Sequence, residues 1–354
     1  MSGAFAAEIL ERGARAFASF AANRVFEQQA AGGRSGESSG FLAWQDQLTQ
    51  IVLDLGAAMR VDEPAVFVQQ VEWLRQAFAV RGAPVEALAG ALEALRSALQ
   101  EELPSEVFSR VDPTLRAGMQ AASRPAGGGA PGTLSPSDAD SRLGLEYLQR
   151  LLSGDRRGAY AIALGAAEGG VPIRRLYLGT LVPALEEVGR LWHAGEISIA
   201  EEHFATDATQ GLLAILASRE HGASPNGKTV VVASAPGNTH DTAVRALSDF
   251  FEMDGWRSIC LGADIPASEF GRAREAFEPD LVAISATMPA QLRGAADAIA
   301  AIRRAGPPTP RTLVGGRAFA RAPDLWKKVG ADAWAGGIED ACAVGRRLVG
   351  LPPA

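Results

Sequence analysis

The segment 228–243 reads KTVVVASAPGNTHDTA. Its short apolar run at 230–233 predicts a strand that is buried on both faces. Similar runs follow at 259–261, 281–284, 312–314 and 331–334, and helical stretches separate them. Strands that alternate with helices through short loops predict an α/β, doubly wound parallel sheet of about five strands over residues 225–354. In such sheets, ligands bind at the carboxyl ends of the strands.

Polar and small residues follow three of these predicted strands. His240 lies on the loop after the first strand, Thr287 follows the third, and the pair Gly315-Gly316 follows the fourth. These strand ends together offer a metal ligand, hydroxyl groups, and room for a flat group to approach the backbone. The simpler interpretation of a lone histidine, as a polar loop residue or helix cap, stays open at this point.

These three positions resemble the motif of the cobalamin-binding domains of methionine synthase, the mutases and related proteins. That motif is DxHxxG, then SxL or SxT, then GG. The counterparts in this sequence are Asn238-x-His240-x-x-Ala243, Ser285-x-Thr287 and Gly315-Gly316.

The resemblance implies that His240 is the lower ligand of cobalt, with Asp241 beside it in the site. The nucleotide tail of the cofactor would enter the sheet next to Ser285, Gly315 and Gly316. The chain departs from the motif at two positions. Asn238 replaces the acid that orients the histidine, and Ala243 replaces the glycine.

A second motif precedes the sheet, in residues 141–224, whose helical periodicity predicts a four-helix bundle. Segment 192–203 reads WHAGEISIAEEH, a tryptophan followed after nine residues by Glu-His. This spacing resembles the CarH-like light-responsive cobalamin proteins, in which the bundle covers the upper face of adenosylcobalamin. The resemblance implies that Trp192, Glu202 and His203 surround the adenosyl group. It also implies that His193 can bind cobalt from above once light has removed that group.

Residues 1–122 are predicted to form a separate all-helical domain, joined to the bundle by the Gly-, Pro- and Ser-rich linker 123–140. This domain resembles globin-like sensor domains, and the order of the three domains resembles the photocobilins, in which the helical domain binds biliverdin. No histidine precedes position 193 and no cysteine precedes 260, so neither a histidine–haem bond nor a thioether-linked bilin can form there. The residues proposed to hold a non-covalent bilin are Arg60, Trp73, Arg75 and Arg81. A dimerisation or partner-docking domain is the alternative.

Composition limits the remaining function classes. The 354 residues carry a formal net charge of −7, and the helical domain lacks a basic recognition helix, so direct DNA binding is not expected. The two cysteines cannot form a disulfide framework, which favours a reducing, cytoplasmic setting. The sequence shows no signal peptide and no apolar stretch long enough to span a membrane.

We therefore expect a photoreceptor of the CarH-like or photocobilin kind. It would sense light through adenosylcobalamin, with a light-dependent homo-oligomeric state, an unknown downstream partner and no enzymatic activity of its own. A corrinoid methyl carrier of a methyltransferase system is the first alternative. A partner-binding stress regulator that uses the sheet without cobalamin is the second.

Overall fold

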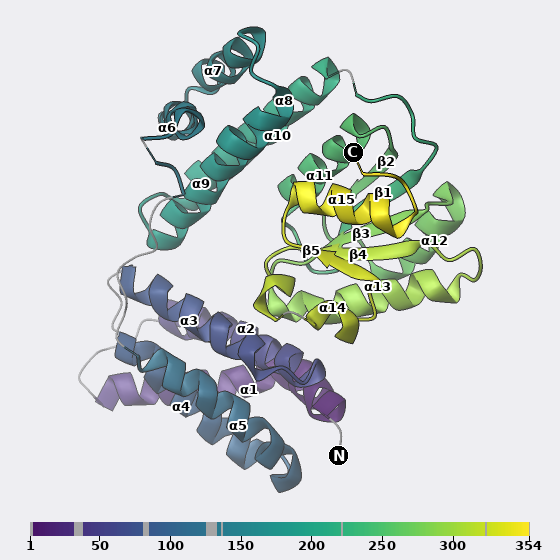
Figure 1. The fold of residues 1–354 in the computed structure, drawn as a ribbon. Helices are drawn as coiled ribbons and strands as arrows, with labels where there is room; N and C mark the ends of the chain where they lie inside the picture. Colours follow the sequence, from purple (N-terminus) through teal and green to yellow (C-terminus); the bar gives the residue numbers. More distant parts are fainter. Residues whose placement is uncertain are drawn as a thin grey trace.

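The computed structural model describes residues 3–31, 38–80, 85–124, 133–135, 137–220, 222–322 and 324–353. Three parts follow one another along the chain (Figure 1). No described helix combines the length and the apolar character that a membrane span requires.

The N-terminal part is helical, which confirms the class predicted for it. Its helices are α1 (Gly3–Ala31), α2 (Ser38–Arg60), α3 (Pro64–Val80), α4 (Val85–Glu102) and α5 (Ser105–Ala122). Asp62 adopts a positive φ of 50°, which reverses the chain between α2 and α3, and Pro64 then begins α3. We call these helices the N-terminal domain.

The middle part comprises α6 (Ala139–Leu152), α7 (Arg156–Glu168), α8 (Ile173–Leu176), α9 (Val182–Ala194) and α10 (Ile199–Arg219). Gly195, with φ of 72°, ends α9, and Ser198 begins α10 through a capping box with Glu201. The sequence predicts a helix that carries Leu176 to Leu191, and the chain is helical over this range. One turn of π-helix, η1 (Tyr177–Leu181), joins α8 to α9. We call α6 to α10 the middle helices.

The C-terminal part is the predicted five-stranded parallel sheet. Its strands are β1 (Thr229–Ser234), β2 (Arg257–Gly262), β3 (Leu281–Ser285), β4 (Arg311–Gly315) and β5 (Ala333–Ala335), in the order β2-β1-β3-β4-β5. Its helices are α11 (Thr242–Met253), α12 (Ala267–Phe277), α13 (Leu292–Arg304), α14 (Leu325–Lys328) and α15 (Ile338–Leu348). The strand order reverses between β1 and β3, which places the ligand crevice of such folds at the carboxyl ends of these two strands.

The two faces of the sheet belong to different hydrophobic cores. Val231, Val282 and Val314 on one face join α12, α13 and the N-terminal domain in a single buried cluster. Val232 and Ala283 on the other face join α11, α15 and the middle helices in a second cluster. Figure 1 shows this arrangement, with α11 and α15 on one side of the sheet and α12 to α14 on the other. The N-terminal domain and the middle helices are thus anchored to opposite faces of the same sheet.

Candidate functional site

The strand register aligns the last residues of β1, β3 and β4. Ser234, the last residue of β1, pairs with Ser285 of β3, and Ser285 pairs with Gly315 of β4. The loops that carry His240, Thr287 and the second glycine therefore leave the sheet side by side at its carboxyl edge.

The His240 loop is held from below by Asn238. This asparagine is fully buried, and its side-chain N–H donates to the main-chain oxygen of Ser285 at 3.0 Å. Its Oδ1 lies 3.2 Å from Nδ1 of His240 and accepts the main-chain N–H of the same histidine at 3.2 Å. When Nδ1 carries the ring proton, it donates to Asn238, and the lone pair of Nε2 stays available to a metal. The amide therefore occupies the orienting position that an acid holds in the motif.

Charges from two directions act on His240. Desolvation in the loop and the guanidinium of Arg317 lower the pKa of the imidazole, while Glu202 of α10 raises it. The net direction is downward, which favours the neutral form that ligates metals. The residue is still exposed, so the loop leaves it accessible. Helix α10 packs beside this loop, where Gln210 donates to the side chains of Asp241 and Thr242 at 2.8 and 2.9 Å.

The loop after β3 is fixed by Gln291 of the short helix η2 (Pro289–Gln291). The side-chain oxygen of Gln291 accepts the main-chain N–H groups of Thr287 at 2.7 Å and Met288 at 2.9 Å. Its amide group donates to the main-chain oxygen of Gly237 at 3.1 Å. One glutamine thus ties the Thr287 loop to the His240 loop.

The glycine pair after β4 is required by the neighbouring backbone. Gly316 has φ of 92°, and a Cβ there would lie 2.4 Å from the carbonyl oxygen of Ala286. A Cβ on Gly315 would lie 3.3 Å from the carbonyl oxygen of Ala335. The absence of side chains at this pair therefore lets the neighbouring backbone pack closely at the sheet edge.

The motif predicted to cover the cofactor lies on α9 and α10. Trp192 and His193 are half-buried near the end of α9. Glu202 holds its neighbour His203, with Oε2 2.6 Å from the Nδ1 of that ring. His203 is 74% exposed, so it points away from the protein core. Asp241 connects this region to the sheet, because its carboxylate accepts from Gln210 of α10 at 2.8 Å.

Trp73 of the N-terminal domain contacts His193 of the middle helices. The Trp73 ring of α3 stacks on His193, with ring centroids 4.0 Å apart and planes inclined by 25°. The guanidinium of Arg317, next to Gly316, lies 5.2 Å from the centre of the same indole. Trp73 therefore joins the middle helices to the loop after β4.

The three proposed bilin residues that the structure describes make separate contacts. Arg60 is bound to Glu11 through two hydrogen bonds of 2.9 and 2.7 Å. Arg75 is buried and donates to the main-chain oxygen of Arg124 at 3.3 Å. Trp73 faces His193, and Arg81 lies outside the described residues. Bilin binding by these residues remains a prediction.

Sequence patterns did not single out Arg317 or Gln291. Arg317 follows the glycine pair directly and could have been included with it, because a residue next to a phosphate- or corrin-facing loop is well placed for an anionic group. Gln291 gives no such signal, because its importance arises only from the packing of two loops that are 50 residues apart.

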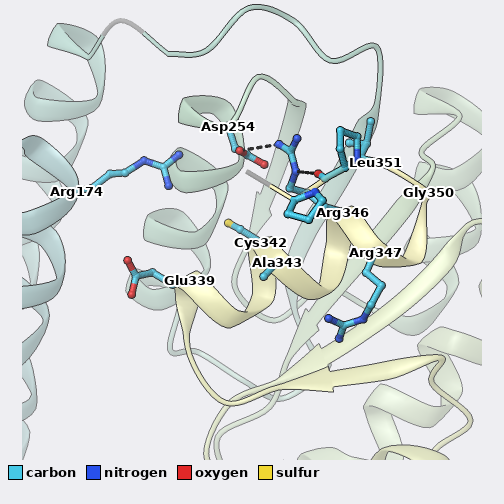
Figure 2. Close-up of a pocket in the computed structure, with 11 residues that line it drawn as sticks. Arg174, Asp254, Glu339, Cys342, Ala343, Arg346, Arg347, Gly350 and Leu351 are labelled. Carbon is cyan, nitrogen blue, oxygen red and sulfur yellow. Dashed lines mark hydrogen bonds and ion pairs between the residues drawn. The ribbon is translucent and has the colours of Figure 1, made fainter.

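A cavity of about 850 Å³ lies elsewhere, between Arg174 of α8, helix α15 and the C-terminal segment (Figure 2). Arg346 in its wall donates to Asp254 at 2.8 Å and to the main-chain oxygen of Pro352 at 2.6 Å. Asp254 follows the end of α11, whereas His240 precedes its start, and this 12-residue helix rises about 18 Å. The cavity is therefore separate from the His240 site.

The residues at the His240 edge fit a corrinoid. They present one imidazole with an oriented ring, a serine at the switch point between β1 and β3, and glycines at the next strand end. A corrin ring supplies four equatorial nitrogen ligands, so one protein imidazole is the donor set that its metal requires.

Comparison with known families agrees with this geometry. Residues 228–344 match a B12 binding domain family, and residues 145–217 match a second B12 binding domain family. These matches support a place for the chain among cobalamin-binding proteins, and they cover both the sheet and the middle helices.

Two kinds of curated relatives are found. The transcriptional repressor CarH of Myxococcus xanthus is 28% identical over 149 residues, which are 42% of this chain and 49% of that protein. The chain thus spans about half the length of this repressor. A corrinoid protein of Desulfitobacterium hafniense is 23% identical over 211 residues, 58% of this chain and 96% of that protein.

The trimethylamine corrinoid protein of Methanosarcina barkeri is 26% identical over 163 residues, 45% of this chain and 74% of that protein. Among solved structures, the monomethylamine corrinoid protein of the same organism aligns with a TM-score of 0.51 and 19% identity. It covers 59% of this chain and 100% of that chain, and at this identity it supports the fold alone.

Proposed function

We propose that this protein senses light through adenosylcobalamin held between the middle helices and the His240 edge of the sheet. One observation supports the proposal: α10, which bears Glu202, contacts the residues next to His240, and α9, which bears His193, is linked through Trp73 to the loop after β4. Gln210 of α10 donates to Asp241 next to His240, and the Arg317 guanidinium lies over the Trp73 ring that stacks on His193. These contacts support our assignment of the proposed lower ligand and of the residues expected above the corrin to one site.

Bound adenosylcobalamin supplies a cobalt–carbon bond that light breaks. His240 would hold the metal through its ring nitrogen, and Asn238 orients that ring. Above the ring, Trp192, Glu202 and His203 line the space for the adenosyl group. His193 would respond to the loss of that group, and because His193 lies on α9, the middle helices would move with it. This movement converts a change at one bond into a change of domain arrangement and of oligomeric state.

A corrinoid methyl carrier is the second candidate, and the length of the match to a corrinoid protein favours it. A carrier must let an enzyme reach the upper side of the metal. Here the N-terminal domain packs on the loops after β3 and β4, where Ala290 donates to Asp54 and Gln69 donates to the main chain of Arg321. The domain therefore restricts access from one side, which supports the sensor over the carrier. A regulator that works without cobalamin gains no support from the B12 matches.

Biliverdin in the N-terminal domain is a further part of the proposal, based on the order of the domains. A retained red absorption band after gel filtration with biliverdin is the expected result. Replacement of Arg75 by alanine should weaken that band, because a buried arginine is the best placed of the described candidates to meet a propionate. The output is proposed to be a protein partner rather than an enzymatic reaction.

The test is an absorption spectrum of the protein after gel filtration in the dark with adenosylcobalamin, before and after green light. We expect retained corrinoid bands that shift irreversibly to those of a form with two imidazole ligands. His240→Ala should lose the cofactor or change its dark spectrum, and His193→Ala should keep the dark spectrum and alter the lit one. Thr239→Ala, on the same exposed loop, is the matched control. Retention with photolysis only as slow as that of the free cofactor would favour the methyl carrier, and no retention would refute the proposal.

A further inference from the structure

The contact between the N-terminal domain and the middle helices lies at the edge of the cofactor site. The N-terminal domain shares its core with one face of the sheet, and the middle helices share theirs with the other face. Between them, α3 meets α9, and the ring stack of Trp73 on His193 is formed there. A displacement of α9 relative to the sheet is therefore also a displacement of His193 relative to Trp73.

Helix α3 also contacts the segment after β4 one turn before Trp73, through Gln69 and Gln70. Gln70 accepts from Nη2 of Arg321 at 2.8 Å, and Gln69 donates to the main-chain oxygen of Arg321 at 3.0 Å. Arg321 belongs to η3 (Phe319–Arg321), the short helix that follows the glycine pair and Arg317. One face of α3 thus contacts the loop after β4 through Gln69, Gln70 and Trp73.

The guanidinium of Arg321 makes only some of the hydrogen bonds that it could make in this contact. Nε and Nη1 of Arg321 are buried without a hydrogen-bond partner among the described residues. A buried guanidinium with unmade hydrogen bonds costs free energy. Opening this interface to water would therefore cost less free energy than opening an interface whose polar groups are all paired. The interface is therefore able to change when one of its contacts is withdrawn.

We infer that Trp73 is the residue through which the N-terminal domain responds to the ligation state of His193. The inference rests on the proposed function, because it assigns the regulation of the same site. With the upper side of the metal closed, His193 stays stacked on Trp73 and the domain stays docked. When His193 ligates the metal, its ring leaves the indole, and α3 loses the contact that joins it to the middle helices. Trp73 is a positioning residue, since it acts through His193.

The first test uses the protein without cofactor. Trp73→Ala, His193→Ala and the double variant form a cycle in urea unfolding, with Trp44→Ala as the control. Trp44 packs on Phe78 inside the same domain, with ring centroids 5.9 Å apart. We expect the Trp73–His193 pair to be non-additive by roughly 2- to 10-fold in the unfolding equilibrium constant, and the Trp44–His193 pair to be additive. Trp73→Phe keeps an apolar ring and should retain part of the coupling if the alanine variant folds poorly.

The second test follows exchange of the upper ligand in the dark. Protein is mixed with hydroxocobalamin, and absorption reports the replacement of the upper water by His193. Trp73→Ala should speed this step by about 2- to 10-fold, because His193 no longer has to leave the stack. Normal retention of the corrinoid with an additive cycle and an unchanged rate would overturn this inference alone. Failure of the wild-type chain to retain any corrinoid would overturn the proposed function, and the inference with it.

Discussion

Replacement of Asp54 by asparagine is expected to stabilise the protein above neutral pH. Asp54 lies on α2 and is fully buried where the N-terminal domain meets η2. Its Oδ1 accepts the main-chain N–H of Ala290 at 3.3 Å, and Oδ2 is buried without a partner among the described residues. Burial raises the pKa of this carboxyl group to about 7, against smaller opposing effects of Ala290, Gln50 and Arg321. Near neutral pH, the folded protein therefore carries a carboxylate in a position that disfavours its charge.

The magnitude follows from the difference between the folded and unfolded pKa values. The shift from 3.8 to about 7 corresponds to roughly 4 kcal/mol, since each pKa unit is equivalent to about 1.4 kcal/mol. The folded state binds the Asp54 proton more tightly than the unfolded state does. The free energy that this proton contributes to stability is therefore fully present below pH 3.8 and is lost as the pH rises through about 7. Asparagine stays neutral and can still accept from Ala290. The advantage of Asp54→Asn should therefore grow between about pH 4 and pH 7 and then level off near 4 kcal/mol.

Urea unfolding of the wild type and the variant, measured between pH 4.5 and pH 8.5 by circular dichroism, tests this expectation. Asp46→Asn is the matched control, because Asp46 is exposed on the same helix. The control should show no such dependence on pH. A difference between Asp54→Asn and the wild type that stays constant over this range would refute the reasoning.

Four further substitutions test the site and the core. Gly316→Ala should lower the free energy of unfolding by about 1–3 kcal/mol, because of its positive φ and the carbonyl oxygen 2.4 Å from the new Cβ. Gly315→Ala should cost less, and equal losses would contradict this account. Asn238→Ala should raise the dissociation constant for hydroxocobalamin by about 10- to 100-fold in a dark titration, and an unchanged affinity would exclude the orienting role. Tyr147→Phe should cost about 1 kcal/mol in urea unfolding, because the Tyr147 hydroxyl donates to buried Thr209, which itself donates to a main-chain oxygen. No change would place that hydrogen bond at the low end of its class.

Much of the fold could be predicted because it depends on local signals. Pro64 begins one helix and Gly195 ends another, which are the positions that proline and glycine favour in helices. Short apolar runs with helices between them predicted the parallel sheet correctly. The π-helical turn Tyr177–Leu181 was not predicted, because its residues continue a helical pattern. The Tyr177 hydroxyl lies 2.8 Å from the main-chain oxygen of Leu213 and 2.8 Å from the carboxylate of Asp249. These contacts come from other elements, so no local sequence pattern contains them.

The candidate site was predictable only along the strand ends. His240, Ser285 and Gly315 follow strands that the pattern identified, and parallel strands bring their ends together. The positions of Trp73 and Arg317 depend instead on how the N-terminal domain docks on the sheet, and the packing of two domains leaves no periodic signal in either one. The roles of His193 and Glu202 remain predictions from the motif spacing.

The division of the sheet between two cores has a practical consequence for dissecting the molecule. Residues 123–140 separate the helical regions in the sequence, yet the apolar cluster on the α12–α13 side continues into the N-terminal domain. Leu48, Ile51, Val66 and Phe67 are among its fully or almost fully buried members. A chain cut at this segment would expose an apolar surface on the C-terminal fragment. That fragment should therefore self-associate or precipitate. The shortest fragment that stays monodisperse is therefore longer than the shortest fragment that carries the cofactor motifs. Self-association of the shorter fragment would result from the exposed apolar surface and not from a response to light.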